Sequence, residues 1–117
     1  MLLGLIDAIH KVASLPVYSY GTTRVEDCVL YEYVCVSDNG AVAQDKLTLH
    51  VIARDPQACK EASRKIMHAL VTCGDEEKLG AKSIVLNGGG TLKDYNTNTV
   101  HEYMYFYITR RSCLYGG

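Results

Sequence analysis

The sequence predicts an α+β fold in which two helices pack on one face of a mainly antiparallel sheet of four to five strands. Three observations support this prediction. A strong helix signal over residues 55–73 directly follows an alternating strand pattern, an Asn-Gly turn joins two long β-rich runs, and a two-faced strand pattern closes the chain. The predicted order of elements is α-β-β-(β)-α-β-β, with the bracketed strand optional.

Length and composition indicate a single domain. The chain has 117 residues, and its 48% of hydrophobic residues suffice for an ordinary core. A formal net charge of −1 gives no basic surplus for binding nucleic acid and permits self-association. The sequence contains no membrane-spanning stretch and no basic region before its apolar start. We expect one domain over residues 1–117, with residues 112–117 as a disordered tail.

The opening segment, residues 2–14, has helical periodicity with few polar residues, namely Asp7, His10 and Lys11. Its apolar arc is wider than a helix packed on a sheet by one side requires. The arc is explained either by burial within the chain or by contact with another subunit. For the second interpretation we name Leu2, Leu5 and Ile9 as candidate interface residues.

Two β-rich runs, residues 24–36 and 42–52, flank a turn with Asn-Gly chemistry at residues 37–40 and predict a long hairpin. A short extended piece, residues 16–20, precedes it. Alternation in the first run places Tyr31 and Tyr33 on one face together with Val29. In the second run, Leu47, Leu49 and Val51 alternate with polar residues.

The second helix is predicted over residues 55–73. Asp55 is suited to cap the first free N–H groups, and Pro56 fits the first helical turn. Gly74 is expected to end the helix in a left-handed conformation. Apolar residues at spacings of three and four form the packing stripe: Cys59, Ala62, Ile66, Ala69, Leu70 and Cys73.

After this helix, residues 83–86 predict a short strand, and residues 87–99, beginning with Asn-Gly-Gly-Gly, predict an exposed loop. The last strand is expected over residues 100–110. Its two faces differ, because Tyr103, Tyr105 and Tyr107 alternate with Met104 and other apolar residues.

No residue pattern in the chain predicts catalysis, a cofactor or a metal. The triple glycine at residues 88–90 does not lead into a helix, as a phosphate-binding loop would. His101 and Glu102 are neighbours in a strand and point to opposite faces. The five cysteines lack zinc-ligand spacing, and Cys59 falls on an apolar stripe, which favours reduced, packed thiols.

The tyrosines are the most unusual feature, with nine Tyr against one Phe and no Trp. Rows of Tyr are typical of protein interfaces, since the ring buries area while the hydroxyl finds a partner. A solvent-facing sheet explains them equally well. Stacking on single-stranded nucleic acid would need a basic groove, and only Arg110 and Arg111 lie nearby. The candidate interface residues from the tyrosines are Tyr31, Tyr33, Tyr103, Tyr105 and Tyr107.

The order of elements resembles that of the tail terminator and tail completion proteins of long-tailed phages and prophages. Four segments carry the resemblance: residues 1–14, 45–51, 55–73 and 100–109. The resemblance implies a non-enzymatic protein that assembles as a ring, a hexamer, on the end of the tail tube, stops tail polymerisation and forms the head–tail joining surface. The implied partners are copies of itself, the tail tube protein and the head–tail connector protein, with no membrane and no sequence-specific nucleic acid.

The resemblance also implies a location at the head-proximal end of the virion tail, and in the host cytoplasm during assembly. It leaves open whether the isolated chain is monomeric. Another head–tail connector or minor tail component is an alternative of the same class. A small ferredoxin-like ligand-binding domain or enzyme is an alternative of a different class, and it would need a pocket formed by His50, Asp55 and Cys59.

Overall fold

The computed structural model describes residues 2–21, 26–72 and 79–112. Within them the order of elements is α1 (Leu2–Ala13), β1 (Val17–Ser19), β2 (Cys28–Asp38), β3 (Val42–Ala53), α2 (Pro56–Leu70), β4 (Ser83–Asp94) and β5 (Thr99–Arg111). The predicted α+β class is confirmed, including the optional strand, which is β1. No helix of the described residues has the length and apolar character needed to cross a membrane.

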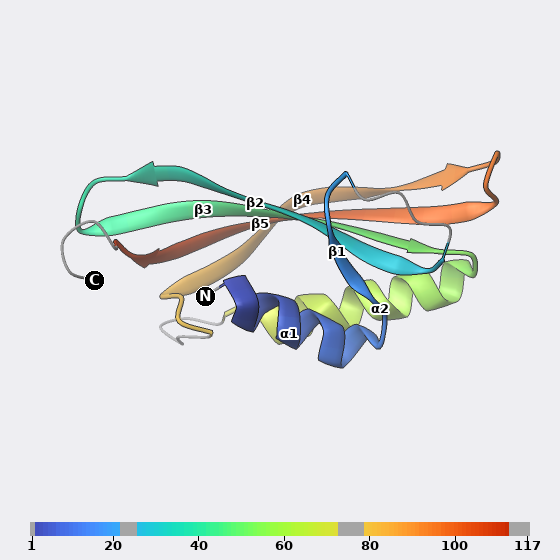
Figure 1. Cartoon of the computed structure of the whole chain (residues 1–117), viewed down its shortest axis with the longest axis horizontal. Coiled ribbons are helices and arrows are strands. Elements are labelled where there is room, and N and C mark those ends of the chain that lie inside the picture. Colours follow the sequence, from blue (N-terminus) through green and yellow to red (C-terminus); the bar gives the residue numbers. More distant parts are fainter. Residues whose placement is uncertain (1, 22–25, 73–78, 113–117) are drawn as a thin grey trace.

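The strands form one sheet in the order β1-β2-β3-β5-β4. The short β1 runs parallel to β2, and the other neighbours are antiparallel. Both helices lie on the same face of this sheet, with α1 packed against α2 and β1, and α2 packed against β3 and β5 (Figure 1). The opposite face, which we call the outer face, carries no helix (Figure 1).

The core lies between the helices and the sheet, because the apolar face of the sheet and the apolar stripes of the helices pack together there. Strands contribute every second residue, and the helices contribute one stripe each. The largest fully buried side chains of this core are Leu5, Ile9, Leu47, Leu49, Ile66, Leu70, Ile84, Phe106 and Ile108. The wide apolar arc of α1 is thus used in large part within the chain.

The prediction of a short strand and a long glycine-rich loop after α2 is wrong. Strand β4 continues through the glycines to Asp94, with an irregularity between Leu86 and Gly89, and the turn comprises residues 95–98. Gly88 has a φ of 106°, and a Cβ on Gly89 would lie 2.3 Å from the carbonyl oxygen of Tyr103. The glycines allow a β-bulge that keeps β4 paired with β5.

Helix α2 begins as predicted, since the Asp55 carboxylate accepts a hydrogen bond from the Gln57 amide at 3.1 Å. Its predicted end at residue 73 is wrong. The helix ends at Leu70, Val71 is extended, and the Thr72 amide donates to the Ile84 carbonyl at 3.0 Å, which joins the chain to β4. The proposed glycine cap, residue 74, lies outside the described residues.

The ends of two other strands also differ from prediction. Strand β2 begins at Cys28, and the predicted start at residue 24 lies outside the described residues. Strand β5 runs to Arg111, and the next residue, Ser112, is buried and donates its amide to the Ala41 carbonyl at 3.1 Å. Ser112 is therefore packed against the turn between β2 and β3, whereas residues 113–117 lie outside the described residues.

Candidate interaction surface

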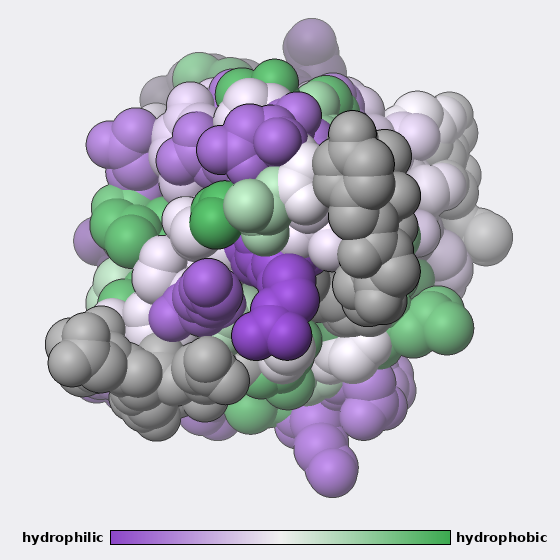
Figure 2. All heavy atoms as spheres, turned by 90° about the vertical axis from the view of Figure 1, so that its left-hand side faces the viewer, coloured by the Kyte–Doolittle hydropathy of each residue, from purple (hydrophilic) through white to green (hydrophobic). Residues whose placement is uncertain are grey.

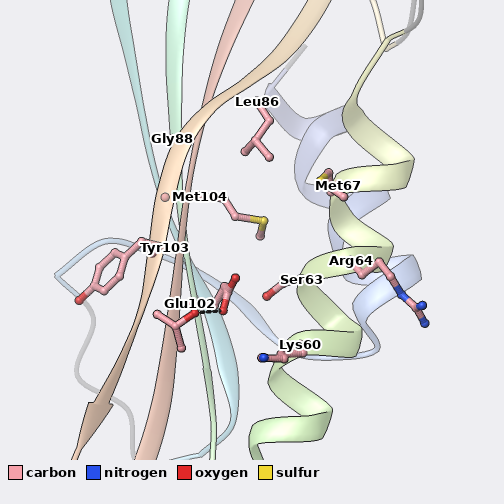
Figure 3. Close-up of a pocket in the computed structure, with 12 residues that line it drawn as sticks. Lys60, Ser63, Arg64, Met67, Leu86, Gly88, Glu102, Tyr103 and Met104 are labelled. Atoms are coloured by element: carbon pink, nitrogen blue, oxygen red, sulfur yellow. Dashed lines mark hydrogen bonds between the residues drawn. The ribbon is translucent and has the colours of Figure 1, made fainter.

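The tyrosine row of β5 lies on the outer face. Tyr103, Tyr105 and Tyr107 pair with the polar residues of β3, while Met104 and Phe106 between them are buried under the helices. Figure 3 shows Tyr103 pointing away from α2, opposite to the direction of Met104. All three tyrosines are partly exposed, so their rings form a surface rather than a core.

Side chains of β3 hold these rings in place. The Lys46 Nζ lies 5.0 Å from the centroid of the Tyr105 ring, in cation–π contact. The His50 ring stacks on Tyr103 with centroids 4.2 Å apart and an interplanar angle of 20°. Burial, followed by the neighbouring Tyr20 and Tyr105, raises the pKa of Tyr103, so its hydroxyl is neutral at physiological pH.

A histidine pair lies at one end of the tyrosine row. His50 Nε2 is 2.6 Å from His101 Nδ1, and His101 Nε2 is 2.7 Å from Thr99 Oγ1. His50 is only 7% exposed, and its Nδ1 is buried without a hydrogen-bond partner among the described residues. Burial, followed by the neighbouring His101, lowers the pKa of His50 to about 4. His50 is therefore uncharged at neutral pH.

Exposed aliphatic residues extend this surface toward both edges of the sheet. On the outer face, β2 carries Val34 with 47% exposure, and β4 carries Val85 and Leu92 with 52% and 57%. Together with the tyrosines they span the outer face from β2 to β4. A broad surface of aromatic and aliphatic groups with few charges is typical of protein–protein contact.

The structure does not bring all the predicted interface residues to one surface. Tyr31 and Tyr33 pair with Leu49 and Leu47, so they lie on the helix-covered side of the sheet and pack against the core. Leu5 and Ile9 are fully buried, and Leu2 is partly exposed. The exposed apolar side chain of α1 is Leu3, at 82%, which the helical pattern alone did not single out.

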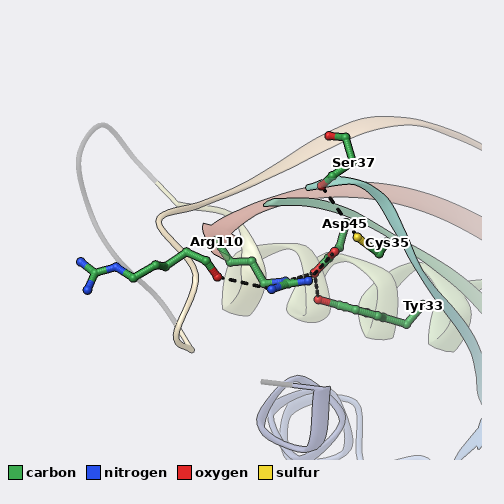
Figure 4. Close-up of polar contacts among 6 residues, drawn as sticks. Tyr33, Cys35, Ser37, Asp45 and Arg110 are labelled. Carbon is green, nitrogen blue, oxygen red and sulfur yellow. Dashed lines mark hydrogen bonds and ion pairs between the residues drawn. The ribbon is translucent and has the colours of Figure 1, made fainter. Parts of the chain in front are cut away.

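The sequence reasoning also missed a buried polar cluster where the sheet extends beyond the helices (Figure 4). Asp45 is fully buried. Its carboxylate accepts hydrogen bonds from Arg110, with Nε at 2.6 Å and Nη2 at 3.3 Å, and from the Tyr33 hydroxyl. Burial and then the Asp45 carboxylate raise the pKa of Tyr33, which keeps its hydroxyl a donor. Viewed from this end, hydrophilic residues gather near the middle of the molecule (Figure 2).

The residues required by the enzyme alternative do not converge. His50 is on the outer face, whereas Cys59 is buried on the helix side with its Sγ 3.6 Å from the Val51 carbonyl. Burial raises the pKa of the Cys59 thiol to about 11, and Asp55 serves as the helix cap. Among the described residues no group of three or more His, Cys, Asp or Glu side chains could hold a metal ion.

A groove of about 530 Å³ lies between α2 and β4, on the helix side of the sheet (Figure 3). Apolar side chains from α2 and the sheet, namely Met67, Leu86 and Met104, point into it, and the Lys60 amine points toward it from α2, whereas the Arg64 guanidinium points away from the sheet. The Ser63 hydroxyl donates to the Cys59 carbonyl at 2.8 Å. The groove therefore offers apolar contact and positive charge without an activated nucleophile.

Comparisons with known proteins identify a similar fold but no family. No family model and no curated protein matches the sequence. A solved structure with a similar fold is a chain from the virion of a native gene transfer agent particle, with a TM-score of 0.62 and 16% identity. The alignment covers 89% of this chain and 84% of that chain. The two chains share a fold.

Proposed function

We propose that the chain is a structural protein of a phage or prophage particle, and that it caps the tail tube as a ring. The observation that supports this proposal is the likeness over nearly the whole chain to a protein of a gene transfer agent virion. The ring stops tail polymerisation and presents its free side to the head–tail connector. The protein works at the head-proximal end of the tail and is built into the particle in the host cytoplasm.

The outer face supports a role in assembly. A ring needs a heterologous contact, in which one patch of each subunit binds a different patch of the next, and further surfaces for the proteins above and below. Tyr103, Tyr105 and Tyr107 offer rigid aromatic area with hydroxyls at the rim, as in protein interfaces. The exposed valines of β2 and β4 widen that area. We assign this face to contacts with other virion proteins, and we expect the ring to contain six copies.

Deletion of the gene from the producing phage or prophage tests the proposal. Without the cap, we expect tails of irregular and extended length and heads without tails in electron micrographs. Expression of the wild-type chain from a plasmid should restore joined particles of normal length. Normal tails that fail to join heads would instead indicate another head–tail connector component, and joined particles of normal length would refute a structural role at this position.

A further inference from the structure

The helix layer is incomplete beneath one edge of the sheet. Helix α2 packs on β3 and β5, while β4 lies at the sheet edge beyond them. The groove between α2 and β4 is the space that this arrangement leaves open (Figure 3). Its apolar floor includes two methionines, Met67 and Met104, whose flexible side chains adapt to an inserted group.

The opposite side of the subunit carries an exposed stripe on α1, formed by Leu3 and Asp7. Leu3 in the first turn of α1 is 82% exposed, and Asp7, one turn later on the same stripe, is also exposed. Next to Leu3, the backbone of Gly4 is also open, since a Cβ at that position would meet no atom within 4 Å. This stripe of α1 borders β1, at the other end of the strand order from β4.

Charge and chemistry match between these two sides. Leu3 fits the apolar floor of the groove, and Asp7 carries the charge opposite to that of Lys60. The carboxylate lining the groove, Glu102, already accepts a hydrogen bond from Thr91 Oγ1 at 2.7 Å. Among the described residues the Lys60 amine has no ion-pair partner, so an acidic partner is favoured.

We propose that the first two turns of α1 of one subunit bind in the groove of the next subunit, with Leu3 on its apolar floor and Asp7 beside Lys60. The occupant is a second copy of this chain. Because this stripe of α1 and the groove lie at opposite ends of the strand order, every subunit both donates and receives a helix. Such a heterologous contact closes a ring when the rotation from one subunit to the next is a fixed fraction of a full turn. This inference rests on the proposed function, and it names the surfaces that join neighbouring subunits.

Charge exchange tests the contact directly. We expect Asp7→Lys and Lys60→Glu, each alone, to weaken self-association of the full chain on the order of tenfold or more, measured by sedimentation velocity and native mass spectrometry. Combining the two substitutions should restore association to near the wild-type level. Lys11→Glu is the matched control: it makes the same change of charge as Lys60→Glu, but on the side of α1 that faces α2, and it should have no effect.

A second variant tests the apolar part of the contact. Leu3→Asp should weaken association as strongly as Asp7→Lys while leaving the thermal unfolding curve unchanged, since Leu3 is exposed in the subunit. Association that is insensitive to Leu3→Asp and Asp7→Lys overturns this inference and leaves the proposed function standing. A wild-type chain that never associates, alone or on tubes of its own genome's tail tube protein, overturns both.

Discussion

The histidine pair predicts a specific loss of stability in mild acid. His50 is buried and neutral in the folded protein, with a pKa of about 4 against 6.5 for a free histidine. A pKa lowered in the folded state means that the unfolded chain takes up the proton first. The contribution of His50 is therefore complete above pH 6.5 and is lost as the pH falls from 6.5 toward 4. A difference of this size corresponds to about 3 kcal/mol of the free energy of unfolding.

Urea denaturation at a series of pH values from about 4.5 to about 7.5 measures this effect, because that range covers most of the interval between the two pKa values of His50. His50→Gln retains a polar group beside His101 but does not titrate, so its free energy of unfolding should fall much less with acid than that of the wild type. His68→Gln, an exposed position on α2, is the matched control and should follow the wild type. Parallel curves for the wild type and His50→Gln would refute the assignment of a desolvated, neutral His50.

Three further substitutions or labels test the fold. Arg110→Met leaves the buried Asp45 carboxylate unpaired and should lower the free energy of unfolding by about 3–5 kcal/mol in urea denaturation. Gly89→Ala places a Cβ against the backbone of β5 and should cost about 2 kcal/mol in the same assay. In the native protein a maleimide should modify the exposed Cys35, whereas Cys59, buried and with a pKa of about 11, should react only after unfolding.

The two substitutions have matched control variants. Pairing Arg110→Met with Asp45→Asn removes the uncompensated charge, and it should recover most of the lost stability. Gly90→Ala should be nearly neutral, because a Cβ at that position meets no atom within 4 Å. Equal losses of unfolding free energy for the two glycine variants would contradict the close packing of Gly89 against β5. Rapid labelling of Cys59 in the native protein would contradict its burial.

Local signals in the sequence predicted most of the fold. The carboxylate of Asp55 before Pro56 determines where α2 begins, and the two-residue alternation around Leu47 determines which side of β3 is buried. The course of β4 could not be predicted in this way. Its glycine run has no intrinsic strand propensity, and pairing with the full length of β5 decides its conformation.

The candidate surface was only partly predictable, because it depends on register. Alternation placed Tyr103, Tyr105 and Tyr107 on one face of their strand. It did not predict whether Tyr33, in another strand, would lie on the same side of the sheet. The contact of His50 with His101 joins residues 51 positions apart and arises from the register of β3 against β5. No local pattern shows such a pair.

The number of copies in purified particles tests the central claim most directly. Quantitative mass spectrometry of intact particles, normalised to the tail tube protein, should find a small, fixed number of copies, six for the proposed ring, and the same number in particles with shortened or lengthened tails. A copy number that rises with tail length would identify a tube subunit instead. Absence of the chain from purified particles would contradict a structural role in the virion.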